Sequence, residues 1–593
     1  MSRQKARLAL RITSTLSVPV VLLGLASAAT AAPPTPPEVA IPGSESPKAA
    51  IAHKLSNAPA TQLRTVQIAL APRDPQGLNQ LLSNLSNPSS PDYRKYLTPQ
   101  EYSARFGPTQ QSVDQVVKFL ESHGLQVNSI ATGKQSISAT GTNAQLSSAF
   151  ATNLALYQDP ETTGTFVGAE GAVKLPSSVA TLVTNVAGLT DERAPFKPAS
   201  RPSPDATGKT AQAKTLAPKS TDQGSGPKGG FTPAELRKAY NTASITGGND
   251  GAGAVVALVE FSGHDASNPA AYDAQYGISA PAVENVNVDG GPTDVEGQGE
   301  VDLDIEVLHA IAPQAKILNY QSPNTGNADL DLYGAIVNDN RASIISSSWG
   351  LPEAATSSSH VQALSNIFKQ AAAQGITVFS AAGDHGASDN WSSGSTALTV
   401  DSPSSDPNVT GVGGTRLSID SSTGAWSSET VWNDYVDNGD TWRGAGGGGV
   451  SKFFTRPSWQ TGVGVNLNQK RQVPDISSAA AEYQYSGYTE LFDKNGNDKG
   501  PGWTAFAGTS AAAPLNAAFL ALTSVKGGGV KFGNINPLIY QIAADDAGAF
   551  HDVTSGTNSI VGNAASYAAT TGFDKASGWG SPVFPNFATG LLK

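Results

Sequence analysis

Hydrophobic residues in the C-terminal two thirds of the chain form short continuous runs that alternate with amphipathic segments. Runs typical of buried strands cover residues 254–261, 316–320, 343–348 and 377–381. Segments with helical periodicity lie between them, at residues 300–311, 329–337 and 358–373. Buried strands interleaved with helices predict a mainly parallel sheet covered on both faces, with functional side chains at the carboxyl ends of the strands. We therefore expect an α/β domain over residues 231–593.

The N-terminal part of the chain shows a different mixture of patterns. Strand-like segments at 65–70, 125–130, 136–139 and 153–157 accompany helical segments at 75–85, 99–105 and 110–123. These segments predict a separate, smaller domain of helices and strands over residues 64–194. Residues 32–63 are rich in Pro, Ala and Ser and are interpreted as a tether. Residues 195–230 are rich in Pro, Ser, Lys and Gly and are interpreted as an exposed, cleavable linker.

Length and composition narrow the classes of function. The 593 residues exceed the usual size of one domain, which agrees with two or three domains. The formal net charge of −11 gives no support to a nucleic-acid partner. The chain has no cysteine, which excludes disulfides, thiolate metal sites and cysteine nucleophiles together. Any metal that adds stability is therefore expected to bind through oxygen.

The first 31 residues have the pattern of a secretion signal. Four basic residues precede an apolar run at 18–29, and Ala29-Thr30-Ala31 matches a small-x-small cleavage site. The run is short for a membrane span, and a signal anchor is the alternative interpretation. We expect residues 1–31 to be removed as a signal peptide, leaving a secreted, extracellular protein without a membrane segment.

A candidate nucleophile lies in residues 507–514, Ala-Gly-Thr-Ser-Ala-Ala-Ala-Pro. Gly508 permits a tight turn, and the helix N-terminus that follows favours negative charge near Ser510. The small residues after Ser510 leave room for a substrate. A Gly-Thr-Ser alone is also found in helix caps and loops, so a plain cap is the alternative. We interpret Ser510 as a catalytic serine.

The group that activates this serine is the next question. None of the seven histidines lies in a His-Gly-Thr setting, and no histidine is an obvious base. The segment from Glu300 to Glu306 instead places acidic residues at every second position of a predicted helix. Glu300 and Asp304 share one face of that helix, and Asp302 and Glu306 share another. A carboxyl pair buried in a cleft would share a proton, whereas a solvated acidic face is the alternative.

Four motifs in order resemble those of the sedolisin family, the serine-carboxyl peptidases, and in particular the pro-kumamolisin type. Residues 90–99, Ser-Pro-Asp-Tyr-Arg-Lys-Tyr-Leu-Thr-Pro, resemble the signature of the activation domain. The spacing of Glu300 and Asp304, the segment 382–384 and the segment 508–510 resemble the catalytic motifs. The resemblance implies a subtilisin-like, mainly parallel sheet with helices on both faces. It also implies a small α+β, ferredoxin-like prodomain before that sheet.

The resemblance also implies a role for each catalytic residue. Glu300 is expected to be the general base toward Ser510, with Asp304 behind it. Asp384 is expected to donate a hydrogen bond to the oxyanion, which requires its carboxyl to be protonated. An ionised base and a protonated donor coexist most readily near the usual carboxyl pKa, about 4. We therefore expect an acid-active endopeptidase that hydrolyses protein and peptide substrates through an acyl-enzyme.

Further residues are placed by the same resemblance. Ser348, Trp349 and Gly350 resemble the strand edge on which a substrate peptide pairs, and a buried core tryptophan is the alternative for Trp349. Glu260 is expected to extend the hydrogen-bond network toward Glu300. Asp401 is expected near the pocket for the residue before the scissile bond. The glycine-rich segment 444–449 resembles a mobile loop beside the cleft, and a plain flexible loop is the alternative.

The C-terminal region resembles a calcium site of the family. Carboxylates and carbonyls form an oxygen-only shell that suits Ca²⁺. The family usually has Gly at the position of Thr570, so a carbonyl ligand there requires Thr to adopt the local backbone angles. Turn residues are the alternative for the two aspartates. The expected ligands are the side chains of Asp552 and Asp574 and the carbonyls of Val553, Thr570 and Gly572.

The order of the domains implies a zymogen. The prodomain is expected to act as an intramolecular inhibitor until self-cleavage within residues 195–230 gives a monomeric mature enzyme that begins shortly before Phe231. Two other functions remain open on the residues alone. One is a subtilisin-like peptidase with an unrecognised histidine base. The other is an exported binding or adhesive protein on an inactivated peptidase scaffold.

Overall fold

The computed structural model describes residues 37–160, 164–191, 197–198, 201–202, 220–246, 250–389, 396–437, 444–492, 498–560 and 565–593. The predicted signal peptide, the start of the predicted tether and most of the predicted linker lie outside these residues. The contacts described below all fall within the unit Glu38–Lys593.

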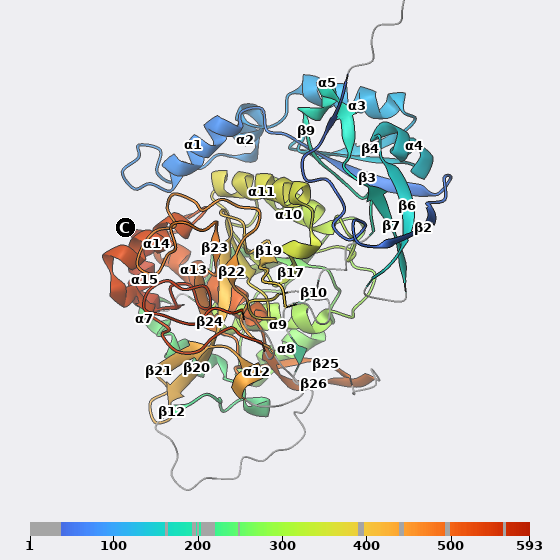
Figure 1. Ribbon diagram of the computed structural model, residues 1–593. Helices are drawn as coiled ribbons and strands as arrows, with labels where there is room; N and C mark the ends of the chain where they lie inside the picture. Colours follow the sequence, from blue (N-terminus) through green and yellow to red (C-terminus); the bar gives the residue numbers. More distant parts are fainter. Residues whose placement is uncertain are drawn as a thin grey trace, which may run out of the picture. The chain divides into compact units, whose positions relative to one another are not determined.

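Six parallel strands form the centre of the C-terminal domain, in the order β20-β18-β16-β13-β15-β14 (Figure 1). A seventh parallel strand, β24, pairs with β20, and the antiparallel strands β12 and β21 also pair with β20. The parallel strands are β13 (Val255–Glu260), β14 (Glu284–Asn287), β15 (Lys316–Gln321), β16 (Ile344–Ser347), β18 (Thr377–Ala381), β20 (Thr410–Asp420) and β24 (Ile476–Ala479).

The central strand β13 explains why this sheet is buried on both faces. Val256 and Leu258 belong to one hydrophobic cluster, and Ala257 and Val259 belong to another. Successive side chains of a strand point to opposite faces, so each face of β13 needs its own cover. The run of apolar residues without alternation is the sequence pattern of such a strand.

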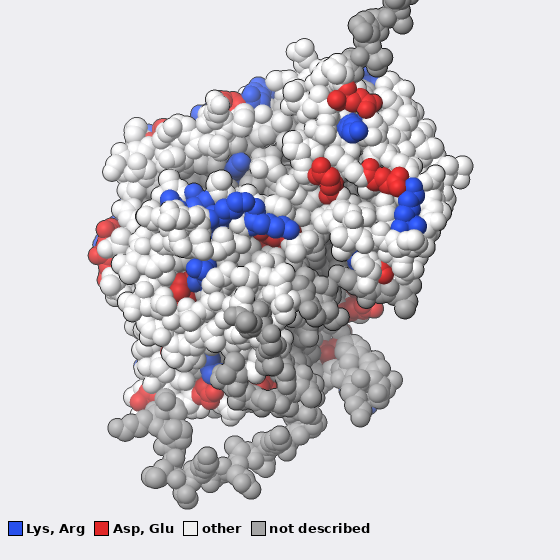
Figure 2. Space-filling model, in the orientation of Figure 1, with Lys and Arg blue, Asp and Glu red and all other residues white. Residues whose placement is uncertain are grey.

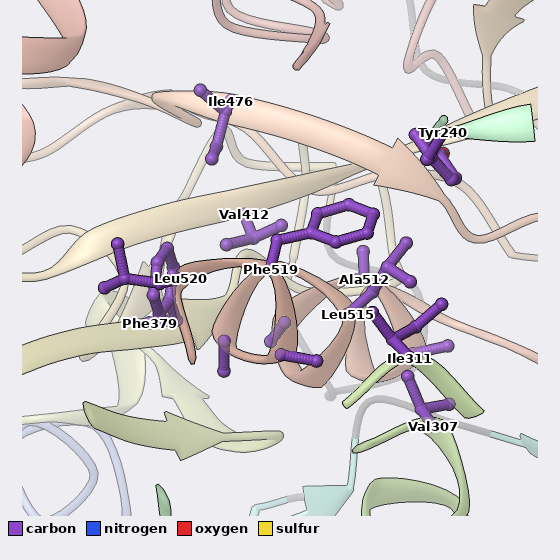
Figure 3. Packing of buried hydrophobic residues seen from close by; sticks show 14 of the residues in the cluster. Tyr240, Val307, Ile311, Phe379, Val412, Ile476, Ala512, Leu515, Phe519 and Leu520 are labelled. Carbon is purple, nitrogen blue, oxygen red and sulfur yellow. The ribbon is translucent and has the colours of Figure 1, made fainter. Parts of the chain in front are cut away.

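Helices supply that cover, two main helices on each face (Figure 1). Helices α9 (Gln298–Ile311) and α13 (Thr509–Lys526) pack on one face, and α10 (Ala328–Asp339) and α11 (Ser358–Ala373) pack on the other. Figure 3 shows Phe519 and Leu520 of α13 toward Val412 and Phe379 of the sheet, and Leu515 toward Ile311 of α9. The structure confirms the mainly parallel sheet with helices on both faces.

The N-terminal domain contains a four-stranded antiparallel sheet in the order β9-β3-β5-β4. Helix α3 connects β3 to β4, and α4 follows β5, which gives the ferredoxin-like order of strands and helices. The structure thus confirms the α+β prodomain fold. The elements are β3 (Leu63–Leu70), α3 (Gln110–Ser122), β4 (Gln126–Ile130), β5 (Ser136–Thr142), α4 (Asn143–Ala149) and β9 (Val183–Ala187).

Part of the range predicted as a tether is ordered in the structure. Strand β1 (Glu38–Ala40) pairs with β8 (Lys174–Pro176), and β2 (His53–Asn57) pairs with β6 (Asn153–Gln158). Ile41 and Ala58 lie in the core of the N-terminal domain. Edge strands need partners for their backbone groups rather than a long hydrophobic run, so these short strands left no pattern in the sequence that would reveal them.

The other elements complete both domains. They are α1 (Pro75–Leu85), α2 (Pro99–Arg105), β7 (Thr165–Glu170), α5 (Ser177–Ala180), β10 (Lys197–Pro198), β11 (Arg201–Pro202), β12 (Ser220–Thr221), α6 (Pro233–Ala239), α7 (Ala243–Thr246), α8 (Ser267–Tyr276), β17 (Trp349–Pro352), β19 (Asp401–Ser402), β21 (Trp426–Val431), α12 (Asp434–Asp437), β22 (Gly449–Val450), β23 (Gln472–Val473), β25 (Tyr485–Phe492), β26 (Asp498–Ala507), α14 (Asn536–Asp545), β27 (Phe550–His551), β28 (Ser581–Pro582) and α15 (Phe584–Leu592). Short 3₁₀ turns lie at Pro227–Gly229, Glu353–Ala355 and Ala547–Ala549.

Charged side chains are sparse on the face shown in Figure 2, where a short row of Lys and Arg crosses the middle and acidic side chains lie in small groups. That face therefore carries mixed charge rather than a field of one sign. Within the described residues, each helix is too short or too polar to cross a membrane.

Candidate active site

Ser510 lies at the second position of helix α13 and is fully buried. The preceding Gly508 caps the helix with φ of 141°, a conformation that favours glycine. Strand β26 leads directly into this turn, so the serine follows the end of a strand and begins a helix. The Ser510 hydroxyl donates to the backbone carbonyl of Ser348 at 3.4 Å. The predicted nucleophile is therefore positioned by strand, turn and helix together.

Pro514 explains a second contact between Ser510 and Ser348. A helical N–H normally donates to the carbonyl four residues earlier, but proline has no N–H, so Pro514 leaves the carbonyl of Ser510 without that bond. The Ser348 hydroxyl lies 3.1 Å from this carbonyl oxygen. The helix that carries Ser510 is thereby tied to the strand edge that begins at Trp349.

Four acidic residues of helix α9 are all buried, with exposures of 2% for Glu300, 0% for Asp302, 0% for Asp304 and 1% for Glu306. The alternative of a solvated acidic face is therefore wrong. Helix α9 packs against α13, α8 and β25 at once, so both of its acidic faces meet protein. A buried carboxyl is costly when ionised, which favours protonation or strong hydrogen bonding.

Asp304 connects the acidic helix to Ser510 through Ser348. The Ser348 Oγ lies 2.7 Å from Asp304 Oδ1 and 3.1 Å from the Ser510 carbonyl. Ser348 can donate to either oxygen, and because a hydroxyl has one hydrogen it donates to one of them at a time. Burial raises the pKa of Asp304 well above its usual range, and the charges of Glu260 and Glu300 raise it further. Asp304 is therefore suited to hold a proton.

Glu260, at the end of β13, extends this cluster toward Trp349. The Trp349 indole N–H donates to Glu260 Oε2 at 2.7 Å. Glu260 also shares a hydrogen bond with Asp304, and burial raises the pKa of Glu260 well above its usual range. Glu300 lies close enough for its charge to raise the pKa of Glu260, Asp304 and Asp384. Glu300 thus lies near Glu260, Asp304 and Asp384. Asp304 is connected to Ser510 through the Ser348 hydroxyl.

The other acidic face of α9 makes different contacts. Asp302 accepts hydrogen bonds from Asn268 at 2.9 Å and Thr489 at 2.7 Å, and His264 Nδ1 lies 3.4 Å from it. Glu306 accepts the backbone N–H of Tyr488. This face therefore ties α9 to α8 and to β25, while the face of Glu300 and Asp304 meets the candidate site. The sequence left this choice of face open.

Four of the five histidines in the C-terminal domain pair with aspartates outside the cluster of Glu260, Glu300, Asp304 and Asp384, and the fifth, His551, stacks on Trp426. The pairs are His264–Asp302, His309–Asp273, His360–Asp329 and His385–Asp389. The described hydrogen bond of the Ser510 hydroxyl goes to a backbone carbonyl. This arrangement agrees with a carboxyl rather than an imidazole base.

Asp384 lies just after strand β18 and contacts the residue before Ser510. The Thr509 backbone N–H donates to Asp384 Oδ1 at 2.8 Å, and the Thr509 hydroxyl donates to the same oxygen at 2.9 Å. Burial raises the pKa of Asp384 well above its usual range, although the two bonds from Thr509 oppose the shift. Both bonds end on Oδ1, so Oδ2 is the oxygen left to carry a proton.

The glycine-rich segment 444–449 packs against the Asp384 segment. The N–H of Ala445 donates to the Asp384 carbonyl at 3.0 Å, and the N–H of Gly447 donates to the Gly383 carbonyl at 2.7 Å. A Cβ on Gly447 would lie 2.0 Å from the carbonyl oxygen of Ala382. The absence of a Cβ at Gly447 therefore lets the glycine-rich backbone lie close to the backbone of residues 382–384. The glycine-rich composition alone did not indicate this role.

Strand β17 contains Trp349 and Gly350, two of the three residues of the predicted strand edge. It pairs with β19 on one side, where Leu351 faces Ser402. Asp401 is buried, and a Cβ on Gly350 would lie 2.6 Å from its Oδ2. Burial raises the pKa of Asp401 well above its usual range, and the charge of Asp389 raises it further. Asp401 therefore lies directly against Gly350, next to the strand edge.

Two short pieces of the predicted linker lie across the same region. Strand β10 pairs antiparallel with β17, with Lys197 opposite Gly350. Strand β11 pairs antiparallel with β26, with Arg201 opposite Ala507. Ala507 stands three positions before Ser510 in the sequence. The linker backbone thus follows the edge of β17 on one side and the strand leading to Ser510 on the other.

The predicted calcium ligands lie together in the C-terminal region. The N–H of Gly572 donates to Asp552 Oδ2 at 3.0 Å, and the N–H of Thr570 donates to Asp574 Oδ2 at 2.9 Å. Gly572 has φ of 78°, whereas Thr570 is not among the described residues with positive φ. Within the described residues, no group of three or more His, Cys, Asp and Glu side chains forms a metal cluster. Backbone carbonyls would therefore have to supply several ligands.

Sequence reasoning missed two groups of the site. The Ser348 hydroxyl was assigned only to the strand edge, but it joins Asp304 to Ser510. Thr509 was treated as part of the serine motif, but it holds Asp384. The position of Pro514, four residues after Ser510, was a usable signal, because it predicts an unsatisfied carbonyl that needs another donor.

A cavity of about 870 Å³ lies elsewhere, between the N-terminal domain and helices α10 and α11. Its lining includes Gln67, Asp331 and Gln370, and not Ser510, Glu300 or Asp384. The catalytic candidates are therefore identified by their contacts rather than by cavity size.

Comparison with known families identifies both domains. A family described as "Pro-kumamolisin, activation domain" matches residues 51–192. A family described as "Subtilase family" matches residues 283–580. The predicted subtilisin-like fold is thereby confirmed for the C-terminal domain, and the activation domain precedes it.

Relatives and a solved structure agree with these matches. Kumamolisin from Bacillus sp. (strain MN-32) is 35% identical over 518 residues, covering 85% of this chain and 87% of the relative. Sedolisin from Pseudomonas sp. (strain 101) is 30% identical over 544 residues, covering 87% of this chain and 85% of the relative. The structure of Pseudomonas sedolisin, a serine-carboxyl proteinase complexed with two molecules of pseudo-iodotyrostatin, aligns with a TM-score of 0.52 and 29% identity over 61% of this chain and 97% of that chain. The chain therefore belongs to the sedolisin–kumamolisin family of serine-carboxyl peptidases and carries an activation prodomain.

Proposed function

We propose that this serine-type peptidase is an acid-active endopeptidase in which Ser510 is the nucleophile and Glu300 is its general base. The single observation that carries the proposal is the gathering of buried carboxyl groups around Ser510 by Ser348 and Thr509. Attack of Ser510 Oγ on a peptide carbonyl forms an acyl-enzyme and releases the amine product. Water then hydrolyses the ester and restores the serine.

The proton from Ser510 passes to Glu300 in this mechanism. Asp304 and Glu260 both have raised pKa values from burial, so the cluster retains protons that orient Glu300 through the shared network. The bond from the Trp349 indole to Glu260 fixes one end of that network at 2.7 Å. Glu300 then acts as a base whose position is set by neighbouring carboxyls and by Trp349.

Asp384 supplies the complementary acid. Oδ1 is occupied by two bonds from Thr509, so a proton on Oδ2 is available to an oxyanion. A donor of this kind contributes about 10²–10³ in rate. The raised pKa of Asp384 keeps that proton in place through acid conditions, and ionisation at higher pH removes the donor. This is the physical basis for the proposed acid activity.

Pairing of β10 with β17 and of β11 with β26 supports cleavage of the linker by the same chain. Peptides commonly bind proteases as an added strand. The linker continues past the site on both sides, along β17 and along β26, which favours an endopeptidase over an enzyme that accepts only chain ends. We propose that the linker blocks the cleft in the zymogen and that self-cleavage within residues 195–230 opens it, with protein and peptide substrates then taking its place.

We further propose one structural Ca²⁺ in the C-terminal region. Asp552 and Asp574 would bind through their side chains, and Val553, Thr570 and Gly572 through their carbonyls. Within the described residues, no hydrogen bond ends on those three carbonyl oxygens. Thr570 is not among the described residues with positive φ, and a backbone of that kind is compatible with Thr. An oxygen-only donor set suits Ca²⁺, whose role here would be to join residues 552–553 to residues 570–574.

Export is proposed from the N-terminal sequence pattern of basic residues, apolar run and small-x-small site. We also propose that the mature enzyme is a monomer.

Glu300→Gln and Ser510→Ala precursors test the proposed mechanism. Each is incubated at pH 4 and pH 7, and linker cleavage and casein hydrolysis are measured against the wild-type protein. We expect both variants to lose self-cleavage and hydrolysis, and the wild type to work at pH 4. His264→Ala is the control for a histidine base, because His264 is the histidine paired with α9. Activity that survives Glu300→Gln but not His264→Ala would select the subtilisin-like alternative. Loss of all hydrolysis in the wild type would select the binding-protein alternative.

A further inference from the structure

A helical arm of the prodomain, residues 72–107, packs on the peptidase domain at α11 and near α15 (Figure 1). The arm consists of α1, α2 and the loop between them. Its small hydrophobic cluster includes Leu78, Leu85, Tyr102 and Phe106, and Ala373 of α11 belongs to the same cluster. The arm therefore completes its core only against the peptidase domain.

The loop of the arm satisfies the end of helix α11. The last carbonyls of a helix have no intrahelical partner. Helix α11 ends at Ala373, and the N–H of Leu97 donates to its carbonyl at 2.9 Å. This hydrogen bond joins backbone to backbone between the two domains.

Arg94 makes a second contact with a helix end. Its guanidinium donates to the carbonyl of Leu591 in the last turn of α15. The guanidinium also lies 5.0 Å from the ring centre of Phe532 and 4.7 Å from that of Tyr93. A cation near the C-terminus of a helix is favoured by the helix dipole, and a cation over an aromatic face is favoured by the ring quadrupole. Arg94 has φ of 56°, a left-handed backbone conformation that is uncommon for residues other than glycine. This turn directs the Arg94 side chain toward the end of α15.

Tyr96 occupies a slot bounded by two glycines. A Cβ on Gly375 would lie 2.7 Å from the Tyr96 ring, and a Cβ on Gly533 would lie 2.9 Å from it. Both glycines have positive φ, 82° and 61°, so side chains are disfavoured there on backbone grounds as well. The slot thus admits a flat aromatic ring against the peptidase backbone.

We propose that Ala373, Gly375, Phe532, Gly533 and Leu591 form a docking site that is separate from the catalytic cleft. Its occupant is the anchor segment of this chain, residues 93–97. The anchor segment holds the prodomain on the enzyme after the linker has been cut, a step that rests on the proposed function. Cutting the linker therefore does not by itself release the prodomain. Release requires Arg94, Tyr96 and Leu97 to leave their places.

Retention after a controlled cut tests this docking site. A recognition sequence for a site-specific endopeptidase is placed at residues 204–214 of a Ser510→Ala precursor, and the added endopeptidase cuts the linker. Because the cut does not depend on Ser510 or Glu300, failure of the proposed mechanism leaves this test intact. Co-elution of prodomain and peptidase domain in size exclusion, over a dilution series, gives the dissociation constant. We expect the two parts to co-elute after the cut.

Arg94→Ala and Tyr96→Ala are the test variants, and Lys95→Ala is the matched control, because Lys95 is an exposed cation between them. We expect Arg94→Ala to raise the dissociation constant about 10- to 100-fold, as for loss of a hydrogen bond to a charged group. Lys95→Ala is expected to match the parent. If the alanine variants do not fold, the Arg94→Lys variant is measured instead. We expect its dissociation constant to be several-fold higher than that of the parent, because lysine lacks the planar guanidinium. Release of the parent prodomain by the cut alone, or equal retention by the Arg94 variants and the parent, overturns the proposal.

Discussion

Thr509 and Asp384, 125 positions apart in the chain, are joined by a backbone N–H that donates to a carboxyl oxygen at 2.8 Å. The hydroxyl of the same threonine donates to the same oxygen at 2.9 Å. Asp384 is thereby fixed to the residue that precedes Ser510. Any movement of the nucleophile's turn would also move the acid beside it, so the two are placed as one unit.

This unit predicts how activity depends on pH. The donor function proposed for Asp384 needs the protonated carboxyl, whose raised pKa means that the proton is lost only as pH rises above the usual carboxyl range. Activity should therefore fall on the alkaline side as Asp384 ionises. In Asp384→Asn the amide donates at every pH, so we expect the alkaline fall to move to higher pH with a lower maximum rate. A pH–rate profile of both matured proteins measures this.

Asp384→Ala provides the control, because it removes the donor altogether. We expect kcat to fall about 10²–10³-fold with little change in KM. An alkaline fall that stays at the same pH in Asp384→Asn would assign that titration to another group.

Trp349→Phe tests the link between Trp349 and Glu260. The change keeps a buried ring but removes the indole N–H that donates to Glu260 at 2.7 Å. That bond lowers the pKa of Glu260, so its loss should make the cluster hold its protons more strongly. We expect kcat to fall about tenfold or more and the acidic side of the pH–rate profile to move to higher pH. Trp503→Phe, at a tryptophan packed on Tyr272, Tyr276 and Tyr488, should leave the profile unchanged.

Glu306→Gln tests the cost of a buried carboxyl away from Ser510. Burial raises the pKa of Glu306 well above its usual range, so its contribution to stability is complete below the unfolded-state pKa, about 4.3, and is lost as pH rises through the raised value. A glutamine keeps an acceptor for the Tyr488 N–H and does not titrate. In a Ser510→Ala background we expect the variant to be more stable than its parent by about 1–3 kcal/mol at pH 8 and nearly equal at pH 4.

Denaturant unfolding at the two pH values gives these free energies. Glu296→Gln is the matched control, since Glu296 is exposed and precedes the same helix. If Glu306→Gln is no more stable than its parent at pH 8, Glu306 does not titrate with a raised pKa.

If the proposed Ca²⁺ is bound, its removal should lower the stability of the C-terminal region. A ligand that binds only the folded state stabilises it by about 3 kcal/mol at 100 times its Kd, so a chelator should lower the unfolding temperature of the Ser510→Ala mature protein. The Asp574→Asn variant should have a similarly low unfolding temperature with and without the chelator. Asp545→Asn, at an exposed position, should respond as the parent does. An unfolding temperature that is indifferent to the chelator in the parent would remove the calcium proposal.

Local patterns were enough to predict the main elements of the fold. The apolar run at 254–261 forms β13, and the periodic segment 358–373 forms α11. Both could be predicted because a buried strand and an amphipathic helix each produce a pattern among residues that are close in the sequence. The linker pairing of Lys197 with Gly350 could not be predicted, since antiparallel pairing of two residues needs no hydrophobic signal. The edge strands β1 and β2 could not be predicted for the same reason.

Motifs predicted the candidate residues of the site, but no local pattern predicted the contacts between them. Glu300 and Asp304 were identified by motif, yet helical periodicity alone left their face undecided, because all four acidic residues of α9 are buried. The bond between Ser348 and Asp304 joins positions 44 apart, and its partner contact with Ser510 joins positions 162 apart. Such contacts depend on how strands and helices pack in three dimensions, and short-range sequence patterns do not predict that packing.

The linker strand beside β17 has a kinetic consequence. A peptide tethered to its own cleft is present at a fixed effective concentration, however dilute the protein becomes. The first cut should then be unimolecular, with a half-time that does not lengthen on dilution. A precursor that spreads through a large volume would mature without having to encounter another copy of itself.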